Sequence, residues 1–296
     1  MGFDVQGIKF LLGAQRSGVS FARPATLGRQ ELFISPRLLR QLLRRVGAAE
    51  SAGLAERLLT EAGGYAEPLL QWLGGERIVS IDASSYEGAT VVHDMNLPIP
   101  DSLRGTFSAV IDGGTLEHIF NYPVAIKNCM EMLEVGGHVL LMTPANNFVG
   151  HGFYQFSPEL FFRLFSDVNG FEVRRAIFAE TTPEARWYEV VDPAKAGRRV
   201  ELINRRPAYL LIQARKLRQV PVLESAPQQS DYTVLWKEPP RERSPGGSTL
   251  AALPGRVVRG ASRRLAAAVE RVSPIGLPLQ KARPDAEVFI EVNWLP

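Results

Sequence analysis

The stretch that decides the fold spans residues 107–144 and reads FSAVIDGGTLEHIFNYPVAIKNCMEMLEVGGHVLLMTP. An apolar segment, 109–111, is followed at once by the acidic, glycine and histidine residues of 112–118, DGGTLEH. A segment with helical spacing comes next, and a second apolar segment, 138–142, follows it. Two buried strands joined by one helix are the repeating unit of a parallel sheet. Ligands bind beyond the carboxyl ends of such strands, so we expect residues 112–118 at an active-site edge.

Apolar segments of strand length recur on both sides of this stretch, and segments with helical spacing separate them. The predicted strands are 25–27, 78–82, 89–94, 109–111, 138–142, 170–173 and 208–212. The predicted helices are 36–46 with Ser35 as N-cap, an interrupted segment over 55–73, 124–133 and 160–165. Gly136 and Gly137 are expected to end the helix over 124–133. This alternation predicts an α/β fold with a doubly wound, mostly parallel sheet.

Composition and length limit the class of protein. The chain has 296 residues, 45% of them hydrophobic and 22% charged, and no apolar run reaches the roughly 18 residues of a membrane span. Its first residues resemble neither a secretory signal nor an acylation motif, which favours a cytoplasmic protein. The single cysteine, Cys129, lies in a helical pattern and is expected to be buried and inert.

The basic residues are concentrated in the last part of the chain. Residues 241–284 contain nine Lys or Arg and two acids, whereas the whole chain has a net charge of only +3. We therefore divide the chain into an α/β domain over 1–224, a linker over 225–255 rich in Pro, Ser and Gly, and a basic tail over 256–296. A basic amphipathic helix over 256–272 suits a peripheral membrane contact, a partner protein or plain solvent. The near-neutral domain argues against nucleic-acid binding.

The order of these motifs resembles that of class I S-adenosylmethionine-dependent methyltransferases of the small-molecule type. The motifs are the strand ending at 112–114, the Leu-Glu-His turn at 116–118, the Gly-Gly at 136–137, the Thr-Pro at 143–144 and a later Phe-Ser-Pro at 156–158. The similarity extends over about residues 21–215. It implies a Rossmann-like, seven-stranded type of sheet, S-adenosylmethionine as cofactor and a small-molecule acceptor.

The resemblance also implies which residues contact the cofactor. Asp82 would accept hydrogen bonds from the ribose hydroxyls, which suits a carboxylate at a strand end. Asp94, with Met95 and Asn96, would lie beside the adenine, and Asp112 with Gly113 would line the methionine portion. For each acid the alternative is a loop-capping role at a strand end.

Three departures concern the cofactor half of the sheet. The glycine-rich loop after the first strand is degenerate, because only Gly28 stands where two or three glycines are expected. Either Arg29 beside it or main-chain donors at the following turn could hold the cofactor carboxylate. Gly28 and Asp82 are 54 residues apart, so an extra helix must be inserted. Asp82 and Asp94 are only 12 apart, so the usual second helix is expected to be a loop.

Methyl transfer needs alignment of methyl and nucleophile, and a base where the acceptor loses a proton. Histidine titrates near neutral pH, so His151, in a loop beyond the strand 138–142, is the first candidate base. His118 is the second candidate, and Tyr154 lies in the same loop as His151. Structural roles for all three stay open. Only Glu117, His118 and His151 are available as metal ligands at this turn, and we expect no metal.

Two other functions remain open. A non-catalytic binding or scaffold protein on the same fold is the main alternative, because a fold does not guarantee its usual activity. A nicotinamide-dependent enzyme is disfavoured by the absence of a G-x-G-x-x-G motif. The sequence therefore predicts a methyltransferase acting on an oxygen or nitrogen of a small-molecule or sugar-derived acceptor.

Overall fold

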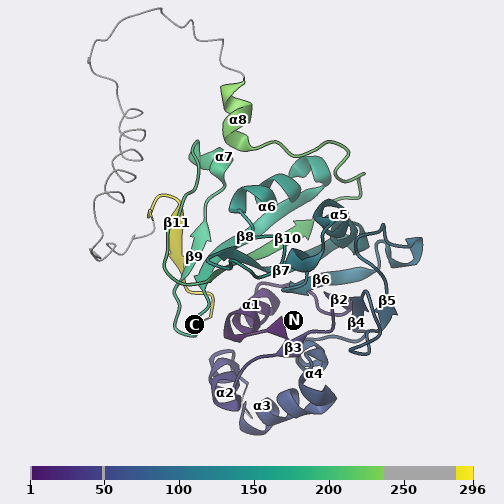
Figure 1. The fold of residues 1–296 in the computed structure, drawn as a ribbon. Helices are drawn as coiled ribbons and strands as arrows, with labels where there is room; N and C mark the ends of the chain where they lie inside the picture. Colours follow the sequence, from purple (N-terminus) through teal and green to yellow (C-terminus); the bar gives the residue numbers. More distant parts are fainter. Residues whose placement is uncertain (1, 49–50, 237–284, 296) are drawn as a thin grey trace, which may run out of the picture. The chain divides into compact units, whose positions relative to one another are not determined.

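A computed structural model describes residues 2–48, 51–236 and 285–295, and every structural statement below concerns these residues (Figure 1). One compact unit comprises residues 1–233 with 284–296, and a second unit, 234–283, lies almost wholly outside the described ranges. The strands are β1 (Gly2–Phe3), β2 (Pro24–Leu27), β3 (Glu31–Leu32), β4 (Val79–Asp82), β5 (Val91–Val92), β6 (Phe107–Gly113), β7 (Leu133–Asn146), β8 (Phe171–Glu180), β9 (Trp187–Val190), β10 (Ala208–Lys216) and β11 (Phe289–Val292). The helices are α1 (Val5–Arg16), α2 (Pro36–Arg45), α3 (Ser51–Thr60), α4 (Glu67–Trp72), α5 (Tyr122–Met132), α6 (Pro158–Leu164), α7 (Pro193–Ala196) and α8 (Ser230–Leu235).

The large sheet has nine strands in the order β11-β9-β8-β10-β7-β6-β2-β4-β5. The five strands from β7 to β5 are parallel to their neighbours, whereas each pairing from β7 through β10, β8 and β9 to β11 is antiparallel. From β2 the chain moves outward to β4 and β5 and then returns to the other side of β2 as β6. The reversal between β2 and β6 is the switch point where doubly wound sheets bind ligands. The predicted α/β fold class is confirmed, and the parallel pairing is confined to the half of the sheet from β7 to β5.

Helices cover both faces of the sheet (Figure 1). One hydrophobic core joins the sheet to α5 and α6, and a second core joins its opposite face to α1, α2, α3 and α4. Local signals explain where two of these helices begin. The Asp4 carboxylate accepts the backbone N–H groups of Gln6 and Gly7 at 2.8 and 3.1 Å, and Ser35 caps α2. The N-cap residues therefore determine where these two helices begin. Burial of their apolar faces stabilises their packing against the sheet.

The predicted elements are found, with shifts at their ends. The chain between Gly28 and Asp82 holds α2, α3 and α4, and residues 83–90 contain no helix, so both predictions about these connections are confirmed. The prediction that Gly136 and Gly137 end α5 is wrong. Helix α5 ends at Met132 and β7 begins at the next residue. The pairing of β6 with β7 shifts register between Phe107 and Ala109, so β7 absorbs the two glycines as an irregularity inside the strand.

The C-terminal segment returns to the sheet. Residues 289–292 form β11, antiparallel to β9, so the prediction that all of 256–296 lies outside the α/β domain is corrected for this part. The predicted basic helix over 256–272 and most of the linker over 225–255 lie outside the described residues. Cys129 is fully buried, as expected. Within the described ranges, no helix is both long and apolar enough to cross a membrane.

Candidate functional site

The loop after β2 turns sharply at Gly28, beside the switch point. Gly28 has a φ of +68°, and its N–H donates to the carbonyl of Ile81 in β4 at 2.7 Å. Its own carbonyl accepts the Thr26 hydroxyl at 2.8 Å. Only glycine adopts this backbone readily. The one glycine of the degenerate loop thus ties the ends of β2 and β4 together at the ligand-binding edge.

Asp82 ends β4 at the same edge, as the sequence predicts. Its Oδ1 accepts the N–H of Ser84 at 3.1 Å, an interaction typical of a strand-end acid that shapes its own loop. The side chain is partly exposed. One carboxylate oxygen therefore stabilises the turn, and the group remains accessible from the edge of the sheet.

The Asp94–Asn96 segment forms a closed turn. Asp94 Oδ1 accepts from the backbone N–H and the side-chain amide of Asn96 at 2.9 and 2.8 Å, and the backbone hydrogen bond is the main cause that lowers the pKa of Asp94. Asn96 Oδ1 accepts the N–H of Asn121 at 2.8 Å. Met95 is buried in the core, only 4% exposed. The predicted adenine-binding residues all have structural partners.

Arg29 already has an acidic partner. Its Nε donates to Glu67 Oε1 at 2.6 Å, its Nη1 donates to the carbonyl of Glu87 at 2.9 Å, and the guanidinium lies 3.9 Å from the ring centroid of Tyr65. Glu67 comes from α4, within the inserted helices. Arg29 therefore links helix α4 to the loop after β4. Its role in binding a cofactor carboxylate stays a prediction.

Asp112 and Gly113 end β6 below the surface. Asp112 is 1% exposed, accepts the Thr115 N–H at 2.9 Å, and burial, helped by the nearby Glu117, raises its pKa well above the ordinary value. A Cβ added to Gly113 would lie 2.5 Å from Gln30 Oε1 and 2.7 Å from the Phe3 ring. The room left by the missing Cβ of Gly113 is therefore occupied by side chains of the protein itself.

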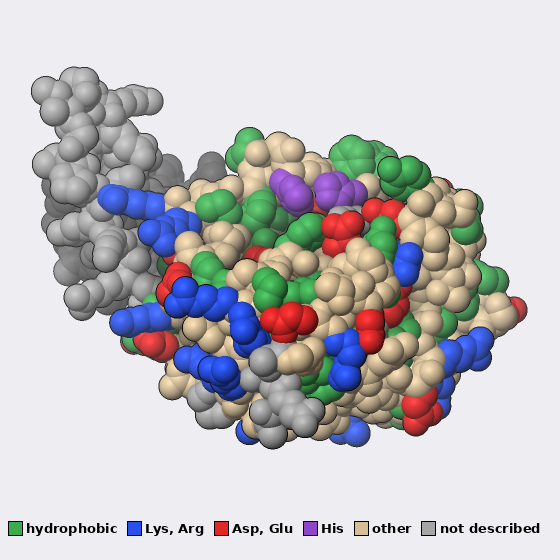
Figure 2. Space-filling model, turned by 90° about the horizontal axis from the view of Figure 1, so that it is seen from below, with side chains coloured by type: hydrophobic (Ala, Val, Ile, Leu, Met, Phe, Trp, Pro, Cys, Tyr) green, Lys and Arg blue, Asp and Glu red, His purple; other side chains and the backbone are tan. Residues whose placement is uncertain are grey.

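Glu117, His118 and His151 gather beyond the ends of β6 and β7. His151 Nε2 lies 3.4 Å from Glu117 Oε1, and the rings of His118 and His151 meet edge to face with centroids 5.1 Å apart. Both histidines are exposed, whereas Glu117 is 1% exposed and its Oε2 is buried without a hydrogen-bond partner. Burial raises the pKa of Glu117 to about 7, and burial, then the neighbouring His151, lowers that of His118. Figure 2 shows histidine side chains side by side on the surface, next to acidic ones.

This arrangement suits proton transfer from an acceptor. A carboxylate behind an imidazole fixes its orientation and stabilises the charged form. The sequence identified both histidines but not Glu117 as the partner of His151. The three side chains also offer ligand atoms that lie within 4.8 Å of one another, which is a set that could hold a metal ion. The expectation of no metal stays a prediction.

Tyr154 is engaged in the structure of the loop. Its hydroxyl donates to the carbonyl of Phe120 at 2.6 Å, and its ring lies in a group with Tyr122 and Phe156. A separate run of rings extends from His151 through Phe148 to Tyr209, with centroid distances of 5.5 and 5.3 Å. Tyr209, in β10, is a site neighbour that the sequence did not identify.

Gly152 allows the His151 loop to lie on Glu117. Its φ is +71°, and an added Cβ would lie 2.8 Å from the Glu117 carbonyl oxygen and 2.9 Å from Glu117 Cγ. The next residue, Phe153, donates its N–H to the same carbonyl at 2.7 Å. The contact between His151 and Glu117 therefore depends on a glycine at position 152.

We expect Gly152→Ala to lower the free energy of unfolding by about 2 kcal/mol, through a strained backbone and a clash with Glu117. Gly150→Ala is the matched control, because φ there is +86° but nothing lies within 4 Å of an added Cβ. Gly150→Ala should lower the free energy of unfolding by about 1 kcal/mol, because it strains the backbone but causes no clash. Urea unfolding of the two variants measures the difference. Equal losses would show that Gly152 does not lie against Glu117.

Comparisons with known proteins give no match to a family model and no match to a curated protein. Solved structures do match. A Burkholderia thailandensis 1,6-didemethyltoxoflavin-N1-methyltransferase, solved with S-adenosylhomocysteine, is 12% identical over 72% of this chain and 78% of its own, with a TM-score of 0.39. A SAM-dependent methyltransferase from Thermotoga maritima is 13% identical over 72% and 91%, with a TM-score of 0.35. The branched-chain polyamine synthase of Thermus thermophilus, solved with 5'-methylthioadenosine, is 15% identical over 72% and 56%, with a TM-score of 0.37. The fold class rests on the strand order itself, which is the doubly wound α/β order with its switch point between β2 and β6.

Proposed function

We propose that the protein transfers a methyl group from S-adenosylmethionine to an oxygen or nitrogen of a small-molecule or sugar-derived acceptor. One observation supports this most: the switch point between β2 and β6 has Gly28 and Asp82 on one side and the cluster of Glu117 with His151 on the other. A cofactor half and an acid–base half thus meet at the edge where doubly wound sheets bind ligands.

The residues on the cofactor side fit S-adenosylmethionine in chemical type. The carboxylate of Asp82 can accept two vicinal ribose hydroxyls. Gly28 brings backbone close to the edge without a side chain, and Arg29 provides a cation beside it. Asp94 and Asn96 would lie beside the adenine, with Met95 buried behind them, and Asp112 with Gly113 would line the methionine portion. When bound, the cofactor supplies an activated methyl group.

The residues on the acceptor side move a proton. His151 Nε2–H points to Glu117 in this scheme, so Nδ1 accepts the proton that the acceptor oxygen or nitrogen loses as its bond to the methyl carbon forms. Glu117 then stabilises the imidazolium. His118 lies against the His151 ring, and Tyr154 closes the loop on Phe120. His151 is therefore the base, with His118 as the alternative.

Calorimetric titration of the full chain with S-adenosylmethionine tests the proposal. Saturable binding is expected, and Asp82→Ala should weaken it at least about tenfold, because two hydrogen bonds to a charged acceptor are lost. Asp101→Ala is the control. It removes an exposed carboxylate from the connection that leads into β6 and should bind like the parent.

The alternative is a non-catalytic binding or scaffold protein on the same fold. The packing of Phe3 and Gln30 on Gly113 favours it, because protein side chains there occupy space next to the switch point. The same titration separates the two functions. Absence of heat at millimolar S-adenosylmethionine, in a protein that unfolds cooperatively, would rule out the methyltransferase.

A further inference from the structure

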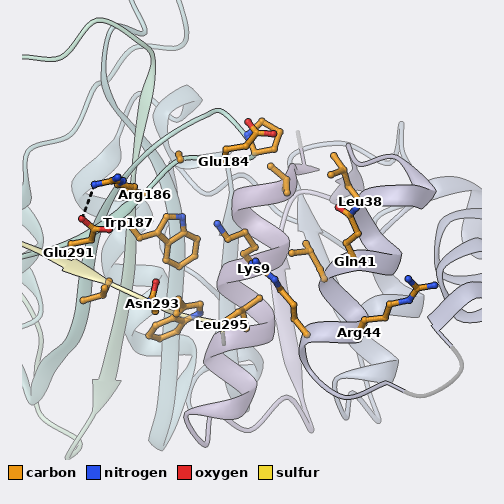
Figure 3. A pocket seen from close by; sticks show the side chains of 17 residues that line it. Lys9, Leu38, Gln41, Arg44, Glu184, Arg186, Trp187, Glu291, Asn293 and Leu295 are labelled. Carbon is orange, nitrogen blue, oxygen red and sulfur yellow. Dashed lines mark hydrogen bonds and ion pairs between the residues drawn. The ribbon is translucent and has the colours of Figure 1, made fainter. Parts of the chain in front are cut away.

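A cavity of about 720 Å³ lies away from the candidate site (Figure 3). Its walls are α1, α2, the segment 183–187 that leads into β9, and the C-terminal segment 291–295. None of the site residues discussed above lines it. Its volume is in the range of small-molecule sites, so it is large enough to enclose a ligand of its own.

Two tryptophans form the apolar wall of this cavity. The Trp187 indole N–H donates to Gln6 Oε1 at 2.6 Å, and the Trp294 indole N–H donates to the carbonyl of Phe10 at 3.2 Å. Their ring centroids are 6.1 Å apart at an interplanar angle of 32°. Hydrogen bonds at the indole nitrogens hold both rings in place, so the wall is preformed. Leu38 and Leu42 of α2 extend the apolar lining.

Positive charge converges on the same cavity. Lys9 Nζ lies 4.7 Å from the centroid of the Trp187 ring and 3.3 Å from Gln6 Oε1, and Figure 3 shows Lys9 beside Trp187. Arg45 also lines the cavity. Burial, and after it the charge of Arg45, lowers the pKa of Lys9 to about 8. At the rim, Arg186 is paired with Glu291 at 3.3 Å.

We propose that this cavity binds a small organic anion, a carboxylate with an aromatic or otherwise apolar body. Lys9 and Arg45 repel each other in a partly enclosed space. An anion bound between them therefore lowers the electrostatic energy. Lys9 and Arg45 bind the carboxylate, and the body lies on the wall formed by Trp187 and Trp294. The lining combines nine apolar residues with six charged ones, four basic and two acidic, so the cavity carries a net positive charge. Apolar walls with charged groups among them are typical of small-molecule sites.

The experiment uses benzoate as the probe, with the full chain and no other ligand present. Calorimetric titration should give saturable binding of benzoate. Benzyl alcohol, which has the same ring without the charge, and inorganic phosphate, which has charge without a ring, should each bind at least about tenfold more weakly. Equal binding of benzyl alcohol would exclude a role for the cations, and equal binding of phosphate would exclude a role for the tryptophans. Absence of benzoate binding would overturn the proposal.

Three variants assign the binding to this cavity. Lys9→Met keeps the aliphatic stem and removes the charge, and Arg45→Gln removes the charge of an exposed side chain. Each should weaken benzoate binding about tenfold, as expected for loss of a charge-assisted hydrogen bond. Arg37→Gln is the matched control, since it removes one charge from the same helix, α2, outside the lining. If Arg37→Gln weakens binding as much as the other two, the effect is one of net charge and the site assignment is wrong.

Discussion

Gly13→Ala is expected to lower the free energy of unfolding by about 3 kcal/mol, although alanine is the better helix former. Gly13 lies in α1, and a Cβ there would stand 1.4 Å from the indole nitrogen of Trp294. The indole cannot stay where it is. It would lose its hydrogen bond to the Phe10 carbonyl and its contact with the Trp187 ring, and the segment after β11 would leave the helix.

The matched control is Gly53→Ala, in the exposed part of α3. Nothing lies within 4 Å of an added Cβ at Gly53, so this change should stabilise the protein by up to about 1 kcal/mol. Urea unfolding of both variants gives opposite signs if Trp294 packs on α1. In a Trp294→Ala background the Gly13→Ala change should become neutral or stabilising. A cost that persists there would show that the crowding at Gly13 comes from elsewhere.

Local sequence signals were sufficient for most of the fold. Ser35 with Pro36 marks the start of α2, and runs of buried apolar residues mark β4, β6 and β10. These elements depend on patterns of a few neighbouring residues. Helix α1 was not among the predicted helices, although Asp4 marks its start as an N-cap. The short strands β9 and β11 were missed. Each has only four residues and carries little pattern of its own, and β11 pairs with β9 from about 100 residues away.

The site could be predicted in residue type but not in partners. The sequence placed His118 and His151 at one edge, and the structure brings their rings into contact. The partner of Arg29 comes from α4, 38 residues away, and the side chains that fill the space at Gly113 come from residues 3 and 30. Such pairings are set by the packing of inserted helices and an N-terminal strand, which no local motif encodes.

Because of His138, the free energy of unfolding should fall by up to about 3 kcal/mol as the pH is lowered from 6.5 to 4. The side chain lies in β7 and is 9% exposed. Burial is the first cause that lowers its pKa from 6.5 to about 4, followed by the positive charges of Arg215 and Arg174, while Glu172 acts in the opposite direction. Arg215 is its direct partner across the β7–β10 pairing.

The sign follows from proton binding. Between pH 4 and 6.5 the histidine of the unfolded chain is protonated and that of the folded chain is neutral, so acid favours unfolding. Above pH 6.5 both states are neutral and the effect is absent. Urea unfolding at a series of pH values should therefore give a shallower decline for His138→Gln than for the parent. Arg215→Gln should reduce the decline in part, because burial still acts on His138 after the cross-strand charge is removed. If the parent and His138→Gln show parallel curves from pH 7.5 to pH 4, His138 is not the buried neutral group that the structure places in β7.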